Sequence, residues 1–196
     1  MPRIGLIYED QAINIAFEIV ARKLFPEPLD LTALEGGSWP GIVGITPNLF
    51  QVLSVFHRVS PFDCVFVVFD SNGATPERRI AHMQEQIGNR KYEFGEPEFH
   101  AIVRHVEAWL LGDQRSLNNA AGKNLPVERY PESIDAKRYL IQTLSNARAR
   151  SYDRSFLRDV LEAANFDDIA AACPSFRSFR AKLLKCPNQQ LPLINV

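Results

Sequence analysis

The chain has 196 residues, enough for one domain or for a domain with a small appendage. Hydrophobic residues make up 46% of the chain, so a substantial core can be buried. The formal net charge is -1, so no overall positive charge indicates binding of nucleic acid. No apolar stretch approaches the ~20 residues of a membrane span, and the quickly acidic N-terminus is not a secretory signal. We therefore expect a cytoplasmic protein without a membrane segment.

The cysteines support the same expectation. Three are present, an odd number, and they form neither a CxxC pair nor a metal-ligand spacing: Cys64, Cys173 and Cys186. In a chain without a signal sequence this predicts reduced thiols.

Strands and helices are expected to alternate over the first 120 residues. Apolar runs predict four strands, at 3–8, 42–45, 63–69 and 99–104. Apolar residues at helical spacing predict helices at 12–24, at 47–59 with Pro47 as the first residue, at 77–87 before Gly88, and from 107 to 113. Such alternation indicates an α/β fold with a parallel-rich sheet of about four strands covered by helices.

The chain from about residue 133 is expected to be helical. Helices are predicted at 134–147, 154–164, 167–172 and 175–184, the last with Pro174 in its first turn. The proline-containing stretch 122–133 is the expected connector. We expect an α/β core at 1–121 and a helical extension at 122–196 that packs on it as one structural unit.

Three acidic residues follow predicted strands. Asp70 closes the apolar run 64–69, Glu9 follows the first strand, and Glu107 follows the last. Because parallel strands end at one edge of a sheet, we expect these carboxylates to converge. Oxygen ligands suit Mg²⁺ or Mn²⁺, and Asn72 offers an amide oxygen nearby. Each acid alone is better explained by capping the following helix, but the three together favour a metal site.

These segments resemble the Toprim domains of topoisomerases, primases and OLD-type (overcoming lysogenisation defect) nucleases. The shared pattern is a first strand ending in Glu, a helix, and an apolar strand ending in Asp-x-Asp. More closely, the chain is similar to a bacterial domain-of-unknown-function family of Toprim-like proteins. The blocks that carry the resemblance are 3–9, 67–73, 106–113 and 173–179. It implies a Toprim-like, Rossmann-like core.

The resemblance also implies roles for individual residues. The implied metal ligands are Glu9, Asp70, Asn72, Glu107 and Asp113, and Lys137 matches a charge-stabilising lysine. Glu9 is implied as general base or ligand, so the catalytic set is Glu9, Asp70 and Lys137. Asn72 departs from the family, because an amide supplies no charge where a second aspartate is expected.

The leading hypothesis is a Mg²⁺-dependent nuclease acting on DNA or RNA. The chain has no P-loop, so the resemblance implies an ABC/OLD-type ATPase partner in a bacterial phage-defence module. A homo-oligomer is left open. One alternative is a catalytically degenerate assembly subunit, because of Asn72. Another is a nucleotide-binding or phosphatase-type α/β domain acting on small phosphate esters.

Two further groups of residues carry weaker signals. The histidines form no metal-ligand motif and are expected to be surface or half-buried: His57, His82, His100 and His105. The helical half is locally basic, and its cations could follow phosphates or lie on a solvated helix face: Lys137, Arg138, Arg148, Arg150, Arg154 and Arg158.

Overall fold

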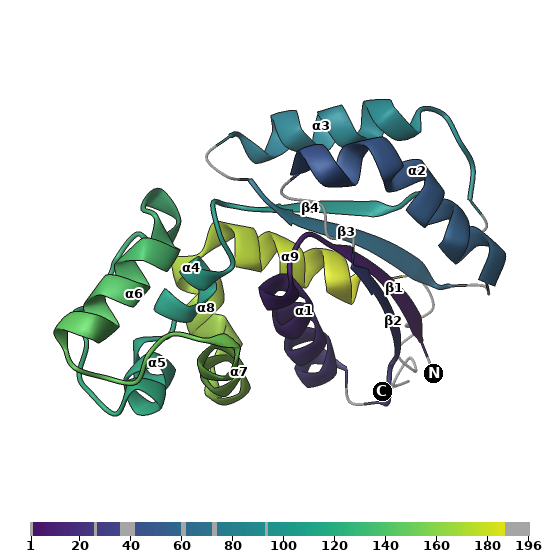
Figure 1. Cartoon of the computed structure of the whole chain (residues 1–196). Coiled ribbons are helices and arrows are strands. Elements are labelled where there is room, and N and C mark those ends of the chain that lie inside the picture. The colour runs from purple at the N-terminus through teal and green to yellow at the C-terminus, as the bar shows by residue number, and fades with distance from the viewer. Residues whose placement is uncertain are drawn as a thin grey trace.

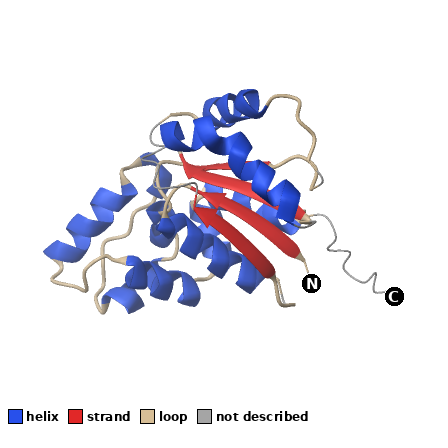
Figure 2. Ribbon diagram, turned by 45° about the vertical axis from the view of Figure 1, so that its right-hand side comes forward, coloured by secondary structure: helices blue, strands red, loops and turns tan. Residues whose placement is uncertain are grey.

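The structure is a computed structural model, and it describes residues 2–25, 27–35, 42–59, 62–71, 74–92 and 94–186. In these residues four parallel strands form one sheet in the order β2-β1-β3-β4 (Figure 1; red in Figure 2). The strands are β1 (Arg3–Tyr8), β2 (Asp30–Glu35), β3 (Cys64–Asp70) and β4 (Glu98–Ile102). The expected α/β fold with four parallel strands and a helical C-terminal part is confirmed.

Helices cover both faces of the sheet. α1 (Gln11–Leu24) and α9 (Pro174–Leu184) lie on one face, and α2 (Ile42–Val59) and α3 (Pro76–Ile87) lie on the other (Figure 1). Successive residues of β3 alternate between the two cores: Cys64, Phe66 and Val68 join the α1–α9 core, and Val65, Val67 and Phe69 join the α2–α3 core. Because both faces are buried, β3 reads as a continuous apolar run.

Further helices of the described residues pack beyond the carboxyl ends of the strands (Figure 1). They are α4 (Glu107–Leu111), α5 (Gln114–Ala121), α6 (Ala136–Asn146), α7 (Arg154–Ala163) and α8 (Phe166–Ala172), with a 3₁₀ turn at Pro131–Ser133. The ring of Trp109 in α4 stacks on that of Phe179, with 5.3 Å between the ring centroids. It meets the ring of Phe176 edge-on, with 5.0 Å between the centroids. The indole also donates a hydrogen bond to Ser175 Oγ at 3.1 Å. The helical part therefore shares its core with the α1–α9 face of the sheet.

Two expected elements are wrong. The segment 42–45 is not a strand but the first turn of α2, which begins before Pro47 rather than at it. The missing strand is β2, in a stretch for which neither a strand nor a helix was expected. A run of only four residues, such as Ile-Val-Gly-Ile at 42–45, fits the apolar spacing of a strand as well as that of a helix. β4 also ends two residues earlier than expected, at Ile102.

The cysteine prediction is wrong for two of the three residues. Cys64 and Cys186 form a disulfide between the start of β3 and the residues after α9, with 5.9 Å between their Cα atoms. The third, Cys173, is a buried free thiol. Sequence spacing gave no sign of the pair because 122 residues separate the partners. None of the helices built from described residues has the length and apolar character to cross a bilayer.

Candidate functional site

Glu9 and Asp70 meet where β1 and β3 end. The two strands are neighbours, with Tyr8 opposite Val68, so the residue after β1 lies beside the end of β3. Glu9 Oε2 accepts a hydrogen bond from the backbone N–H of Asp70 at 3.0 Å. The cap of α1 is instead Asp10, whose Oδ1 accepts from the N–H groups of residues 12 and 13. Glu9 is therefore not the helix cap.

Asp70 carries an unsatisfied oxygen. The residue is 8% exposed, and its Oδ2 lies 3.2 Å from Nδ1 of His105. Its Oδ1 is buried and has no hydrogen-bond partner among the residues that the structure describes. Burial, with a further contribution from the negative charges of Asp10 and Glu107, raises the pKa of Asp70 to about 7. A buried carboxylate oxygen without a partner is costly, and a proton or a cation would relieve it.

A strained turn places His105 beside Asp70. Arg104 has φ 60°, in the left-handed region that non-glycine residues rarely adopt. Its N–H donates to Ser71 Oγ at 2.8 Å, and the Ser71 N–H donates to the Ile102 carbonyl at 2.7 Å. These two bonds hold the turn after β4 against the residue that follows Asp70. Such strain persists where surrounding contacts enforce it, often at functional sites.

One histidine, His105, belongs to the site although sequence patterns did not indicate it. His105 is half-buried, as expected, but no motif indicated its contact with Asp70, which raises the pKa of the imidazole. The only signal was its position three residues after β4. His100 departs from the expectation, because it is 3% exposed and burial lowers its pKa to about 3.

Glu107 lies at the same end of the sheet, at the start of α4, and is only 2% exposed. Its Oε1 accepts a hydrogen bond from the Tyr152 hydroxyl at 2.7 Å and lies 3.6 Å from Lys137 Nζ. Burial and the Glu107 charge raise the pKa of Tyr152 far above its usual value, so the hydroxyl remains a donor. With Asp10 these groups line a cavity of about 210 Å³.

The structure therefore places four of the predicted site residues at the same end of the sheet, in the pairs Glu9–Asp70 and Glu107–Lys137. Asp113 is not among them. Its carboxylate caps α5, accepting from the N–H groups of Arg115 and Ser116, from Ser116 Oγ and from the Asn165 N–H. These bonds lower the pKa of Asp113 and occupy both of its oxygens. Asn72 lies outside the described residues.

The residues at the end of the sheet offer the oxygen donors that Mg²⁺ or Mn²⁺ prefers. Within the described ranges, no three His, Cys, Asp or Glu side chains stand close enough together to enclose an ion. The atom that fits a cation is Asp70 Oδ1, since it is buried and has no partner within the described part of the chain. The Glu9 carboxylate, which accepts a hydrogen bond from the Asp70 N–H, would be the second ligand, and the charge of Glu107 acts on Asp70 from the same end of the sheet.

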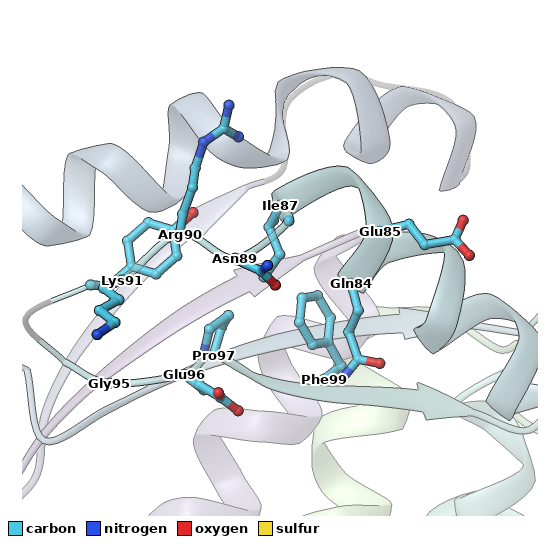
Figure 3. A pocket seen from close by; sticks show the side chains of 12 residues that line it. Gln84, Glu85, Ile87, Asn89, Arg90, Lys91, Gly95, Glu96, Pro97 and Phe99 are labelled. Atoms are coloured by element: carbon cyan, nitrogen blue, oxygen red, sulfur yellow. The ribbon is translucent and has the colours of Figure 1, made fainter.

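A larger cavity, of about 730 Å³, lies at the other end of the sheet (Figure 3). It is formed where α3 ends and β4 begins, and Phe99 lines it. Around it Figure 3 shows the acids Glu85 and Glu96 and the cations Arg90 and Lys91. This cavity is distant from the strand ends that carry Asp70. The size of a cavity therefore does not identify the candidate functional site in this protein.

Comparison with known protein families finds a match over most of the chain. The profile of a family described as a domain of unknown function, DUF4276, matches residues 23–184. No curated protein and no solved structure matches the chain. The matched segment contains Asp70, Glu107 and Lys137 but begins after β1 and Glu9. Because β1 lies between β2 and β3, the sheet needs residues outside the match.

Proposed function

The chain belongs to the DUF4276 family, and from its site we propose that it hydrolyses phosphodiester bonds of DNA or RNA with Mg²⁺ or Mn²⁺. The observation that carries the proposal is the buried Oδ1 of Asp70, which has no partner among the described residues and belongs to the residue whose backbone N–H donates to the Glu9 carboxylate. Three acids at the carboxyl ends of parallel strands, where open α/β sheets bind ligands, support it.

The residues present divide the work as follows. Asp70 and Glu9 would hold the cation, which supplies charge stabilisation at a phosphoryl oxygen and lowers the pKa of bound water. Burial raises the pKa of Glu9, which suits a group that takes a proton from the attacking water. Lys137 is half-exposed beside Glu107 and so can reach a negatively charged substrate.

The wider setting is also part of the proposal. We place the protein among Toprim-like nucleases, acting in the cytoplasm with an ABC/OLD-type ATPase in a phage-defence module. The support is the likeness of the sequence blocks at 3–9, 67–73, 106–113 and 173–179. The description of the matching family neither adds to this nor opposes it.

A second candidate is an assembly subunit that keeps the fold without the chemistry. The favouring observation is that each acid already has a protein partner. Glu9 accepts from a backbone N–H, Asp70 contacts His105, and Glu107 is held by Tyr152 and Lys137. Such pairing would keep the acids in place without a metal.

Cleavage and metal binding together distinguish the candidates. Plasmid, linear duplex and single-stranded RNA are incubated with the protein in Mg²⁺, Mn²⁺ or EDTA, with and without any ATPase encoded beside it. Asp70→Asn and Glu9→Gln should abolish metal-dependent cleavage. Asp159→Asn, an exposed carboxylate in a surface ion pair, is the matched control. Equal cleavage by the Asp70 and Glu9 variants would refute the nuclease.

Binding of Mn²⁺, followed by its electron paramagnetic resonance signal, gives the second measurement. Binding that requires Asp70 but is accompanied by no cleavage of any substrate would favour the assembly subunit. Absence of Mn²⁺ binding by the unmodified protein would remove the metal site altogether.

A further inference from the structure

The outer face of α6 borders a polar groove of about 590 Å³. Its lining includes His105 at one end and, along the helix, Lys137, Arg138, Ile141, Gln142 and Asn146. The opposite face of α6 carries the buried residues, Ala136, Leu140 and Leu144. The groove-lining side chains are therefore not needed to pack the helix, which lies at the outside of the helical part (Figure 1).

The groove is continuous with the acidic site. His105, at its end, contacts Asp70, and Lys137 lines both this groove and the smaller cavity beside Glu107. A chain lying along α6 would thus contact His105 and Lys137, two residues of the groove that touch Asp70 and Glu107. Continuity is the first argument for a substrate that extends beyond the reacting bond.

The lining suits a polyanion. Lys137 and Arg138 supply two cations, and the acid among the lining residues is Asp135, whose Oδ1 accepts the Arg138 N–H as the cap of α6. The positive end of the helix dipole lies at the same place. Beyond the cations the groove offers the amide of Gln142 and an apolar side chain, Ile141, which is 48% exposed.

We propose that this groove binds a single-stranded polynucleotide segment, with its phosphates on Lys137 and Arg138 and its bases against Ile141 and the amides. The inference rests on the proposed function and specifies its substrate. A duplex keeps its bases stacked inside and would use the cations alone, whereas an unpaired strand presents bases to apolar and amide groups as well.

The test measures binding without hydrolysis. Fluorescence anisotropy of a labelled single-stranded oligonucleotide is recorded in EDTA over a series of salt concentrations, and a duplex of the same length is the comparison. Arg138→Gln should weaken binding several-fold and reduce the salt slope by about 0.7, the value for one phosphate contact to a single strand. Gln142→Glu should weaken it also. Lys91→Gln, at the other end of the sheet, is the matched control and should bind normally.

Three results would refute the proposal that the α6 groove binds a single strand. They are no binding by the unmodified protein, unchanged binding by Arg138→Gln, and duplex binding as tight as single-strand binding. The proposed function fails independently. If Asp70-dependent cleavage occurs while the α6 variants bind normally, the groove is wrong and the nuclease stands. If the α6 variants lose binding but no condition gives cleavage, the groove stands and the nuclease is wrong.

Discussion

Replacing Asp70 by Asn tests whether this carboxylate is held in the folded protein at an energetic cost. The substitution keeps the shape of the side chain and removes its ionisation. Burial raises the pKa of Asp70 from its ordinary 3.8 to about 7. Below about pH 3 the carboxyl group is mostly protonated in both the folded and the unfolded chain, so the two proteins should then differ little in stability from this source.

The sign follows from which state holds the proton. As the pH rises from about 4 to about 7, the unfolded chain releases the Asp70 proton while the folded chain retains it, and the folded state becomes less stable. Above about pH 7 the carboxyl group is ionised in both states, so the loss in free energy of unfolding stays constant. A shift of roughly three pKa units at about 1.4 kcal/mol each gives about 4 kcal/mol. His105 offsets part of this below its own raised pKa, where it is protonated beside Asp70.

Thermal unfolding in EDTA is the assay, since each kcal/mol corresponds to about 2–4 °C in a chain of this size. At pH 8 the Asp70→Asn protein should melt about 10 °C higher than the unmodified protein, and below about pH 3 the difference should vanish. Asp159→Asn, a surface control, should change little at either pH. If the Asn variant is no more stable at pH 8, the carboxylate is not penalised by burial and the reasoning fails.

Divalent metal should narrow that difference in stability. Mg²⁺ bound by the folded state stabilises it by about 2.7 kcal/mol at a hundred times its dissociation constant. At pH 8 the melting temperature of the unmodified protein should therefore rise with Mg²⁺, while that of Asp70→Asn should not. An equal response of both proteins would show that the ion binds elsewhere.

Three further changes give independent checks. Tyr152→Phe removes a hydrogen bond from the buried Glu107, so urea unfolding should show a loss of about 1–3 kcal/mol; an unchanged midpoint would contradict the pairing. Reduction of the Cys64–Cys186 bridge should cost about 2–4 kcal/mol, and thiol titration of the unreduced protein in guanidinium should find one free thiol, not three. Asp113→Ala should cost about 2 kcal/mol as a lost helix cap while leaving Mn²⁺ affinity intact; weaker Mn²⁺ binding would return Asp113 to the metal site.

The fold was predictable where burial was strong and not where it was weak. β3 was recognised because both of its faces are covered, which requires an apolar residue at every position. β2 was missed because it is an edge strand with Asp30, Thr32 and Glu35 among its six residues. Its place is fixed by backbone pairing with β1 and by the Arg3–Asp30 ion pair at 2.7 Å, which sequence periodicity does not register.

The acidic residues of the site were predictable, but their partners were not. Neighbouring parallel strands end at the same edge of a sheet. The proximity of Glu9 and Asp70 therefore followed from recognising the two strands that precede them. His105 is 35 residues from Asp70, and Tyr152 is 45 residues from Glu107. Neither forms a motif with its partner, because the turn after β4 and the packing of the helical part bring them together.

The disulfide has a consequence for experiments that cut the chain. It joins the first residue of β3 to a residue after α9 and so encloses most of the molecule in a covalent ring. Inside that ring lies the stretch 122–133, where Val127 and Tyr130 are 66% and 71% exposed. A protease that nicks this stretch would leave both fragments attached to one another, and the cut would become visible on a gel only after a reducing agent is added.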